Sequence, residues 1–443
     1  MYKGRLSESK LESLAGYKKV HLPLLITFLI ISTFGLVMLF SASLAVSYAR
    51  EGGATEMFIK QAGISTAGLL VALLVALAVP IRHFNRPVLR YIVYAVVSVL
   101  LLALPFVGTT INGARRWIFF GSISVQPSEL AKIAAVYFLA TYFSEQRKKR
   151  RQNRHKKVSA RWQPIYDAFV QVTLPALMVI AWIVLILIQP HMSGAIIMTL
   201  LVIFMFVVEG FPFKRLMTGA TILLIFLLIA LMLFLMIGPV MTGQSPGDFI
   251  EDRFAHVFRR LTSFTSPEEA NPDDTRQIEQ AQIALGSGGL FGVGLGRSVQ
   301  KMNWLPESHN DFILAIIGEE LGFAGTFLCL MLFVLFFIFG MSVALNAATS
   351  MTTLIAAGYT FLITVQALLN FGVATHVLPT TGISLPFFSY GGTANFFFML
   401  ASGMILCVSK SGKREDPEIA QYLEPEKKRQ GKSAKPRKRT QAV

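Results

Sequence analysis

The chain has 443 residues, of which 53% are hydrophobic and 15% are charged. With a mean hydropathy of +0.57, most of these residues cannot form the surface of a soluble globule, so the sequence predicts an all-α polytopic membrane protein. The formal net charge of +16 would also suit nucleic-acid binding. The basic residues, however, gather in short loops and tails beside apolar segments, which favours a role in membrane topology and no nucleic-acid partner.

Ten apolar segments can be read along the chain. A basic tail, residues 1–20, precedes an apolar run that is too long for the core of a cleaved signal peptide and is interpreted as a retained first span. The weakest signals are the segment that contains Glu129 and Lys132 and the short turn at Gln189-Pro190. We predict a ten-helix transmembrane domain over 21–410, with helices near 21–46, 58–80, 87–107, 128–144, 168–188, 191–209, 215–238, 311–341, 350–373 and 393–410.

Charge predicts how these helices are oriented. Basic residues are concentrated in the regions that would share one side of the membrane: the N-terminal tail, Arg82 with Arg86, the run from Arg147 to Arg161, Lys214 with Arg215, and the tail after Lys410. Because such loops stay in the cytoplasm, we predict that both termini are cytoplasmic. Residues 411–443 have little to bury and are expected to be a disordered basic tail that is attracted to membrane lipids.

A long loop, residues 239–310, separates the seventh and eighth predicted helices and is expected to be external. Loops of this length are uncommon in folded domains unless they are functional. Its second half is rich in glycine, including Gly292-Val-Gly-Leu-Gly296, but no strand precedes this run, so it is not a nucleotide-binding motif. The glycines are expected to let the backbone turn tightly and approach a substrate or a neighbouring helix.

Ionisable residues cluster where this loop enters the eighth helix. If Pro306 opens the helix, Glu307 and Asp311 fall one turn apart on the same face, with His309 between them. Two carboxylates follow inside the apolar segment, at Glu319 and Glu320. Carboxylates at membrane depth are costly and usually paired, so we expect a structural role for them, either with a cation such as Lys132 or through hydrogen bonds.

Two other external regions carry polar groups. Arg115 and Arg116 follow the third helix, where phosphate binding competes with contact to lipid headgroups as an explanation. The last external loop, 378–393, has no charge but many hydroxyls, Ser389 among them, with two prolines and three glycines. Irregular backbone at membrane depth survives only inside protein or beside a watered cavity, so this loop is expected to turn back toward the external site.

Six stretches together resemble the FtsW/RodA/SpoVE family, also called the SEDS family, from the first span to the last. These are Gly113-Ala-Arg-Arg-Trp-Ile118, Gln126-Pro-Ser-Glu129, Ala284 to Gly296, Leu305-Pro-Glu-Ser-His-Asn-Asp311-Phe-Ile, Gly318-Glu-Glu-Leu-Gly322 and Leu378 to Gly392. Ser298-Val-Gln-Lys301 is more similar to the division-type members than to the elongation-type members. The sequence departs from the common pattern at His191, where many members have Asp, and at Asn310, where Thr is commoner.

The resemblance implies a ten-helix peptidoglycan glycosyltransferase that polymerises lipid II on the outer face of the cytoplasmic membrane, at the division septum. It also implies a single-span class B penicillin-binding protein as a partner, together with other membrane proteins of the division machinery. The essential aspartate of the family falls on Asp311.

The implied reaction assigns roles to these residues. Displacing undecaprenyl pyrophosphate by a sugar 4-hydroxyl needs a base and positive charge on the leaving group, and Asp311 is the candidate base. The candidates for substrate binding are Arg115, Arg116, Lys301, Glu307, His309 and Ser389. Alternatively, Glu307 and Asp311 could hold Mg²⁺ or Mn²⁺, although no ligand spacing establishes a metal site.

Two alternatives to the enzyme remain open. A lipid II flippase would also need ten helices, intramembrane charges and irregular external loops, although the sequence shows no internal repeat of the kind that transporters contain. A non-catalytic scaffold for division proteins would explain the basic tails and would leave the cluster from Glu307 to Asp311 without a role.

Overall fold

The computed structural model describes residues 20–111, 114–121, 123–152, 158–159, 161–189, 191–242, 245, 247, 272–380 and 382–411. The predicted basic tails, 1–20 and 411–443, lie outside these ranges except for residues 20 and 411, as does most of the first half of the predicted external loop. Predictions about those segments therefore stay predictions.

Helices occupy all ten predicted positions. In the described part of the chain, eight helical spans are long and apolar enough to cross a membrane. They are α2 (Leu22–Glu51), α3 (Glu56–Ala78), α4 (Pro87–Val107), the continuous run of α6 (Gln163–Ala168), the π-helical turn η2 (Phe169–Thr173) and α7 (Leu174–Ile188), then α8 (Met192–Glu209), α9 (Phe213–Thr242), α12 (Ile313–Leu345) and α13 (Ser350–Ala374). The break between α7 and α8 confirms the predicted boundary at Gln189. The chain is thus a multi-pass, mostly helical membrane protein.

The remaining two positions are filled by helices of a different kind. α14 (Thr393–Ser409) is apolar but short, and α5 (Pro127–Arg151) carries Glu129 and Lys132. Nearly every side chain of α5 from Pro127 to Ser144 is buried. Because other helices cover α5 on all sides, it need not present an apolar surface to lipid, which explains its weak hydropathy signal.

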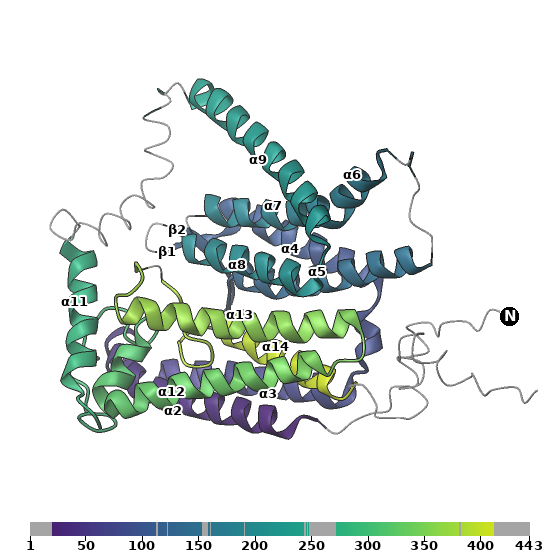
Figure 1. Cartoon of the computed structure of the whole chain (residues 1–443). Helices are drawn as coiled ribbons and strands as arrows, with labels where there is room; N and C mark the ends of the chain where they lie inside the picture. The colour runs from purple at the N-terminus through teal and green to yellow at the C-terminus, as the bar shows by residue number, and fades with distance from the viewer. Residues whose placement is uncertain are drawn as a thin grey trace, which may run out of the picture.

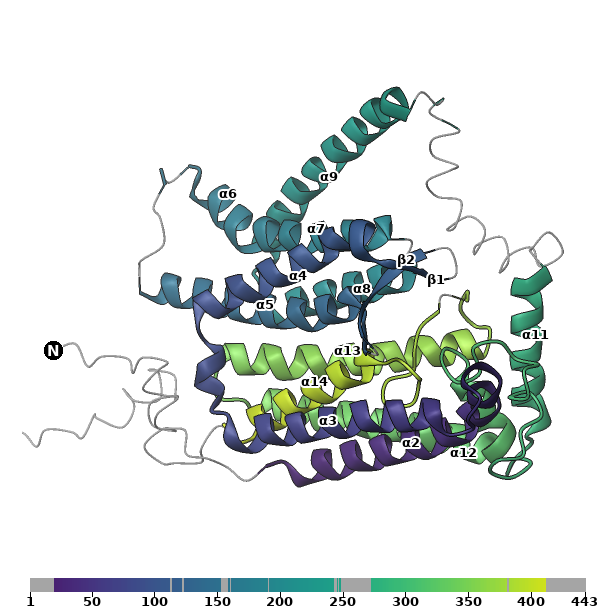
Figure 2. The ribbon, with the colours of Figure 1, turned by 180° about the vertical axis from the view of Figure 1, so that it is seen from behind.

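The helices form two groups joined through α13. Figure 1 shows α4, α5, α7 and α8 in one layer and α2, α3, α12 and α14 in the other, and Figure 2 shows the same division from behind. α13 contacts α5 and α8 on one side and α12 and α14 on the other. It is the most buried of the candidate spans, with 72% of its most apolar window buried.

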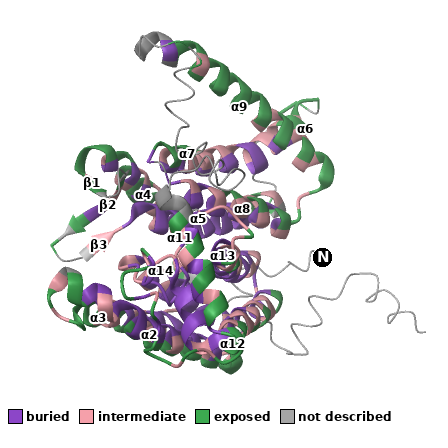
Figure 3. Cartoon of the chain, turned by 90° about the vertical axis from the view of Figure 1, so that its left-hand side faces the viewer, coloured by how far each residue is buried: buried purple, intermediate pink, exposed green. Residues whose placement is uncertain are grey.

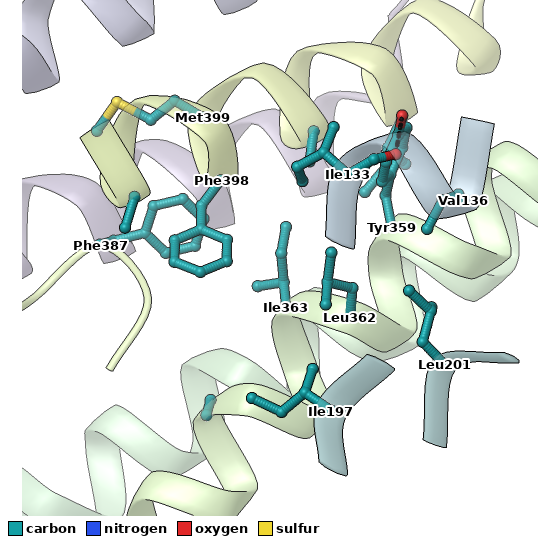
Figure 4. Close-up of a cluster of buried hydrophobic side chains, with 14 of the residues drawn as sticks. Ile133, Val136, Ile197, Leu201, Tyr359, Leu362, Ile363, Phe387, Phe398 and Met399 are labelled. Carbon is teal, nitrogen blue, oxygen red and sulfur yellow. Dashed lines mark hydrogen bonds between the residues drawn. The ribbon is translucent and has the colours of Figure 1, made fainter. Parts of the chain in front are cut away.

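Side chains from both layers meet on α13. Figure 4 shows Tyr359, Leu362 and Ile363 of α13 among apolar residues of α5, α8 and α14. The Tyr359 hydroxyl donates a hydrogen bond to the carbonyl of Ile133 across 3.3 Å, so its one polar atom is satisfied inside the core. α13 is therefore the central packing element of the molecule.

α9 differs from the other helices because none of its most apolar window is buried. It extends away from the two layers in Figure 1, and Figure 3 shows most of its described surface as exposed, with shorter intermediate and buried stretches. A helix that is apolar on every side and packs against little protein is suited to contact with lipid acyl chains.

A small antiparallel sheet lies between α4 and α5, where the sequence had predicted only loop. Its strands are β1 (Thr109–Ile111), β2 (Ala114–Phe120) and β3 (Ile123–Val125), in the order β1-β2-β3. β-branched and aromatic residues are frequent in these strands, which favours extended backbone. The all-α prediction is thus correct for the membrane domain and wrong for this segment.

The second half of the predicted external loop is ordered. α11 (Pro272–Ser287) packs against α12, and turns follow from Gly288 to Phe312. α12 begins at Ile313, close to the predicted 311, so Pro306 does not open the helix, and Glu307 adopts a left-handed backbone conformation with φ 53°. Glu307 and Asp311 therefore lie in these turns and do not occupy neighbouring positions on one face of a helix.

Gly292 and Gly322 let the glycine-rich segment join α12. Gly322 has φ 67° and interrupts the helix, which frees the carbonyls of Glu319 and Glu320 to accept bonds from Val293 N (2.9 Å) and Gly294 N (3.0 Å). A Cβ atom at either glycine would collide with backbone of the other segment. The predicted close approach of this segment to a neighbouring helix is confirmed.

Candidate active site

A cavity of about 730 Å³ lies at the end of the molecule where β2, the turns before α12 and the loop after α13 meet. The first turns of α3, α5 and α8 complete its wall. It is within the size range of ligand pockets in proteins. Its polar or ionisable lining residues include Glu51, Lys60, Arg116, Glu129, Lys132, His191, Gln277, Glu307, His309, Asp311, Gln366 and Tyr390.

Asp311 lies in the wall of this cavity, half-buried, with Glu307 and His309 beside it. The sequence thus correctly placed these three residues together. The Glu307 carbonyl accepts bonds from Asn310 N (3.0 Å) and Phe312 N (3.3 Å), so residues 307–312 form a compact turn. This turn presents carboxylates to the cavity immediately before the apolar part of α12.

Hydrogen bonds to three successive backbone carbonyls hold this turn in place. Tyr390 N donates to the His309 carbonyl (2.9 Å), Ser389 Oγ donates to the Asn310 carbonyl (2.7 Å) and Asn370 Nδ2 donates to the Asp311 carbonyl (2.8 Å). Asn370 Nδ2 also donates to the Ile383 carbonyl (2.6 Å). The loop after α13 therefore does return to the Asp311 turn, as the sequence predicts.

Ser389 has a structural position in this arrangement. It was expected to bind substrate, but its side chain is fully buried and is absent from the cavity lining. Its hydroxyl accepts a bond from Leu385 N (2.7 Å) while it donates to Asn310. Asn370, which is also fully buried, fixes the backbone of Asp311 directly.

The two arginines of β2 do not act as a pair. Adjacent side chains of a strand point to opposite sides, so Arg115 and Arg116 diverge. Arg116 lines the cavity, and its Nε donates to the Gln189 carbonyl (3.2 Å). Arg115 is exposed, does not line the cavity, and donates to the Pro105 carbonyl (2.6 Å) and to Thr110 Oγ1 (3.2 Å). Only Arg116 is placed to meet a ligand there.

Lys132 lies in the cavity wall with two partners. Its Nζ is 2.8 Å from Glu129 Oε1 and donates to Gln366 Oε1 across 2.6 Å, and Gln366 Nε2 donates in turn to Ser384. The Lys132 side chain is only 1% exposed. The sequence had considered Lys132 as a partner for Glu319 or Glu320; that pairing is wrong, because Glu129 lies three residues earlier on the same helix face.

The cation that pairs with Glu320 is Lys301. Their atoms Nζ and Oε1 are 2.6 Å apart, and the side chains are 1% and 0% exposed. Ser41 Oγ contacts both groups, at 2.7 Å from Glu320 and 2.9 Å from Lys301. Lys301 does not line the cavity, so its expected role as a phosphate ligand has no support in this geometry.

Glu319 holds the turn that precedes Lys301 through hydrogen bonds from a hydroxyl and a backbone N–H. Its carboxylate accepts bonds from Ser298 Oγ (2.5 Å) and from Val299 N (2.8 Å). Both intramembrane carboxylates thus have partners, as their cost at membrane depth requires. The structural role predicted for Glu319 and Glu320 fits this arrangement.

Several lining residues were missed at the sequence level. Lys60 is 2.7 Å from Glu51 at the cavity wall, and its presence inside a predicted span was the available signal. Gln366 carried no such signal, because a single amide in an apolar helix is common. His191 is buried with Nδ1 3.0 Å from Ser128 Oγ. Burial raises the pKa of the Tyr390 phenol, so this cavity-lining group remains neutral near pH 7.

The described part of the structure does not show a complete set of protein ligands for Mg²⁺ or Mn²⁺. Over the described ranges, no three or more His, Cys, Asp or Glu side chains converge as a metal site would require. Glu307 and Asp311 both face the cavity, and they are the two carboxylates that could share an ion with a bound substrate.

Comparisons with known proteins agree with this description. Residues 21–414 match the family of cell cycle proteins that comprises FtsW, RodA and SpoVE. Stage V sporulation protein E of Bacillus subtilis is 33% identical over 390 residues, which are 87% of this chain and 96% of that protein. A protein of Coxiella burnetii named "Probable peptidoglycan glycosyltransferase FtsW" is 32% identical over 383 residues, which are 85% of this chain and 92% of that protein.

Solved structures show the same fold. A chain from a peptidoglycan synthase complex that coordinates polymerization and crosslinking is 26% identical, with a TM-score of 0.56 over 85% of this chain and 96% of its own length. The rod shape determining protein RodA of Thermus thermophilus is 24% identical, with a TM-score of 0.56 over 88% of this chain and 97% of its own length. On the extent of the family match, its agreement with the sequence motifs and this fold, the chain belongs to the FtsW/RodA/SpoVE family.

Proposed function

We propose that this protein is a peptidoglycan glycosyltransferase that polymerises lipid II into glycan strands and releases undecaprenyl pyrophosphate. The observation that carries the proposal is the Asp311 carboxylate, held by three backbone contacts to its turn in the wall of a large cavity that also contains Arg116, Lys60 and Lys132. The names of the relatives and the likeness to a chain of a peptidoglycan synthase complex support the same activity.

The geometry supplies the groups that the reaction needs. The 4-hydroxyl of one lipid II attacks the anomeric carbon of a second sugar, a C–O bond forms, and the bond to pyrophosphate breaks. Asp311 would take the proton of the attacking hydroxyl as general base. The pyrophosphate leaves as an anion, so no acid has to protonate it, and cationic side chains would stabilise its charge.

Arg116 is the best candidate for the pyrophosphate contact. Its planar guanidinium can bind phosphate oxygens in a bidentate manner, which an ammonium group cannot do. Lys132 and Lys60 already face Glu129 and Glu51, so each would contribute less net charge. A divalent ion shared by the substrate, Glu307 and Asp311 would supply further positive charge at the same place.

The setting follows from the family and from the charge bias. We place the cavity at the outer face of the cytoplasmic membrane and both termini in the cytoplasm. Relatives named FtsW support a division role at the septum. A single-span class B penicillin-binding protein is the proposed partner, with other division proteins around it, and the synthase complex supports such an assembly.

The test uses full-length protein with Asp311→Asn, assayed on labelled lipid II with and without the penicillin-binding partner. This change keeps the size of the side chain and removes its basicity, so glycan synthesis should fall by a factor of roughly 10² to 10⁴. Glu307→Gln makes the same change of charge in the same cavity: it should cost much less if Asp311 acts as the base alone, and a comparable amount if the two carboxylates hold a divalent ion. Thermal unfolding and co-purification with the partner check that both variants are folded.

Three results would overturn the proposal or part of it. A folded Asp311→Asn protein that polymerises lipid II within a few-fold of wild type would remove Asp311 from the chemistry. If the wild-type protein in liposomes moves labelled lipid II across the bilayer and makes no polymer, the flippase alternative is correct. Normal partner binding without either activity would favour the scaffold alternative.

A further inference from the structure

A second, smaller pocket lies at the opposite end of α4 and α5 from the large cavity. It has a volume of about 100 Å³ and is lined by Asn85, Arg86, Pro87, Arg90, Thr141, Ser144, Glu145 and Lys148. Glu129 of α5 faces the large cavity, and Glu145 lies 16 residues later on the same helix, about 24 Å away at 1.5 Å per residue. The two sites are therefore separated by most of the thickness of a membrane.

Arg90 is the buried polar group of this pocket. Its side chain is 2% exposed, and Nη2 lies 2.5 Å from Glu145 Oε2. The Nε atom of the same guanidinium is buried and has no hydrogen-bond partner in the part of the chain that the structure describes. A buried donor without a partner is costly in a folded protein, so this position is suited to an acceptor from a bound ligand.

The charge around Arg90 favours an anion. Three cations line the pocket, Arg86, Arg90 and Lys148, against one carboxylate, Glu145. Glu145 is shared with Lys149, whose Nζ is 2.6 Å from Oε1. Burial alone would raise the pKa of Glu145, but Lys149 and Arg90 outweigh it and lower that pKa, so the carboxylate is charged near pH 7. An anion that enters meets an excess of positive charge.

The start of α4 adds to this preference. Arg86 is the N-cap residue, Pro87 follows it, and the Arg86 side chain makes no capping hydrogen bond to the described helix. The first N–H groups of a helix and its dipole attract anions. Arg86 and Pro87, at this end of the helix, line the same pocket as Arg90.

The surface of α4 indicates that the anion belongs to a lipid. Four apolar side chains at helical spacing are exposed along α4, on the face opposite the buried Arg90: Val88, Ile92, Val96 and Val99. In a membrane protein such a face is in contact with acyl chains. The pocket lies at the end of a helix that is in contact with lipid, so a phospholipid whose headgroup enters it would keep its acyl chains in the surrounding bilayer, a contact that a free phosphate ion lacks.

We propose that this pocket binds the phosphate group of an anionic phospholipid in the membrane leaflet opposite the large cavity. If the large cavity faces outward, as the proposed function requires, this is the cytoplasmic leaflet. Arg86 and Lys148 reach the headgroup from the exposed rim, and Arg90 meets it from the interior.

The test measures lipid binding to the full-length protein in detergent by native mass spectrometry, with phosphatidylglycerol and phosphatidylcholine as probes. The variant with Arg86→Ala and Lys148→Ala removes two exposed cations and leaves the Arg90 to Glu145 pair in place. Affinity for the first phosphatidylglycerol should fall roughly fivefold for each cation removed. Lys214→Ala, an exposed lysine at the start of α9 that does not line the pocket, is the matched control and should bind as wild type does.

A further variant gives a change in the opposite direction. Glu145→Gln removes the one carboxylate among the pocket residues and should tighten phosphatidylglycerol binding. A purely structural ion pair would not improve lipid affinity when it is broken. The proposal fails if the double variant binds as wild type does, if Lys214→Ala loses as much affinity, or if Glu145→Gln binds more weakly. It also fails if millimolar inorganic phosphate displaces the lipid completely, because the ligand would then be a free anion.

Discussion

The buried pair of Lys301 and Glu320 allows a sharp test of where the substrate binds. Lys301→Met removes the cation and leaves Glu320 with bonds from Ser41 Oγ (2.7 Å) and Ser298 N (3.3 Å). Breaking a buried pair by removing one partner typically costs about 3 to 5 kcal/mol, because the remaining charge is uncompensated. With an unfolding entropy of about 2.1 cal/mol/K per residue over 443 residues, thermal unfolding in detergent should therefore show a midpoint lower by roughly 4 °C.

The double variant Lys301→Met with Glu320→Gln should recover most of this loss. The glutamine introduced at position 320 would keep an oxygen for Ser298 N, its amide could donate to Ser41 Oγ, and neither change would leave a buried charge. Since neither side chain lines the large cavity, the double variant should also polymerise lipid II at close to the wild-type rate.

A matched control separates burial from charge. Lys60→Met breaks a pair whose side chains are 49% and 24% exposed, and such a pair contributes about 1 kcal/mol or less. The reasoning is refuted if Lys301→Met unfolds no earlier than Lys60→Met. A stable double variant without polymerase activity would instead restore Lys301 as a substrate ligand.

Three further predictions concern the site and the ends of the helices. Arg116→Lys should reduce polymerisation of lipid II substantially, because an ammonium group cannot make the bidentate contact of a guanidinium to phosphate. Arg115→Lys, outside the cavity, should not reduce it, and equal rates for both variants would argue for a membrane-anchoring role. In intact cells, a membrane-impermeant thiol reagent should label Val377→Cys and spare Ser159→Cys, and the reverse pattern would mean that the topology is inverted. Both native cysteines are buried, so background labelling of the unsubstituted protein should be low. His21 caps α2 by accepting from Leu24 N (3.3 Å), and burial lowers its pKa. The pKa of His21 is thus lower in the folded than in the unfolded protein, so the cap is fully present above the ordinary histidine pKa and is lost as pH falls. His21→Ala should therefore cost about 1 kcal/mol of stability near pH 8 and less near pH 5. A difference in thermal midpoint that stays constant between these pH values would contradict this.

Local signals were enough to predict the helices and the Asp311 cluster. A bilayer core imposes about 20 apolar residues per span, so hydropathy located even α5, whose charged residues are covered by neighbouring helices. The cluster of Glu307, His309 and Asp311 was visible because its members are adjacent in sequence. The conformation of the turn and the direction of the Glu307 side chain could not be predicted, because they depend on how α12 and the loop after α13 meet.

Pairings between distant residues could not be predicted in the same way. Lys301 finds Glu320 and Ser41, and Lys132 finds Gln366, because packing brings together segments that are far apart in the sequence. From the sequence, Arg115, Arg116 and Lys301 were all candidates for substrate binding. Burial is what distinguishes Lys301, which is enclosed, from Arg116, which faces the cavity.

The way in which the Asp311 turn is held bears on how its side chain can be tested. The bonds that fix the turn are made to the carbonyls of His309, Asn310 and Asp311. Any residue at position 311 provides the same carbonyl, so a change of side chain leaves this support in place. Asn370 also donates to the Ile383 carbonyl and so links the turn to the loop after α13, which lines the same cavity. Loss of activity in a folded Asp311→Asn protein would therefore report on the carboxylate itself, whereas loss of the Asn370 amide should disturb the position of every group in the turn.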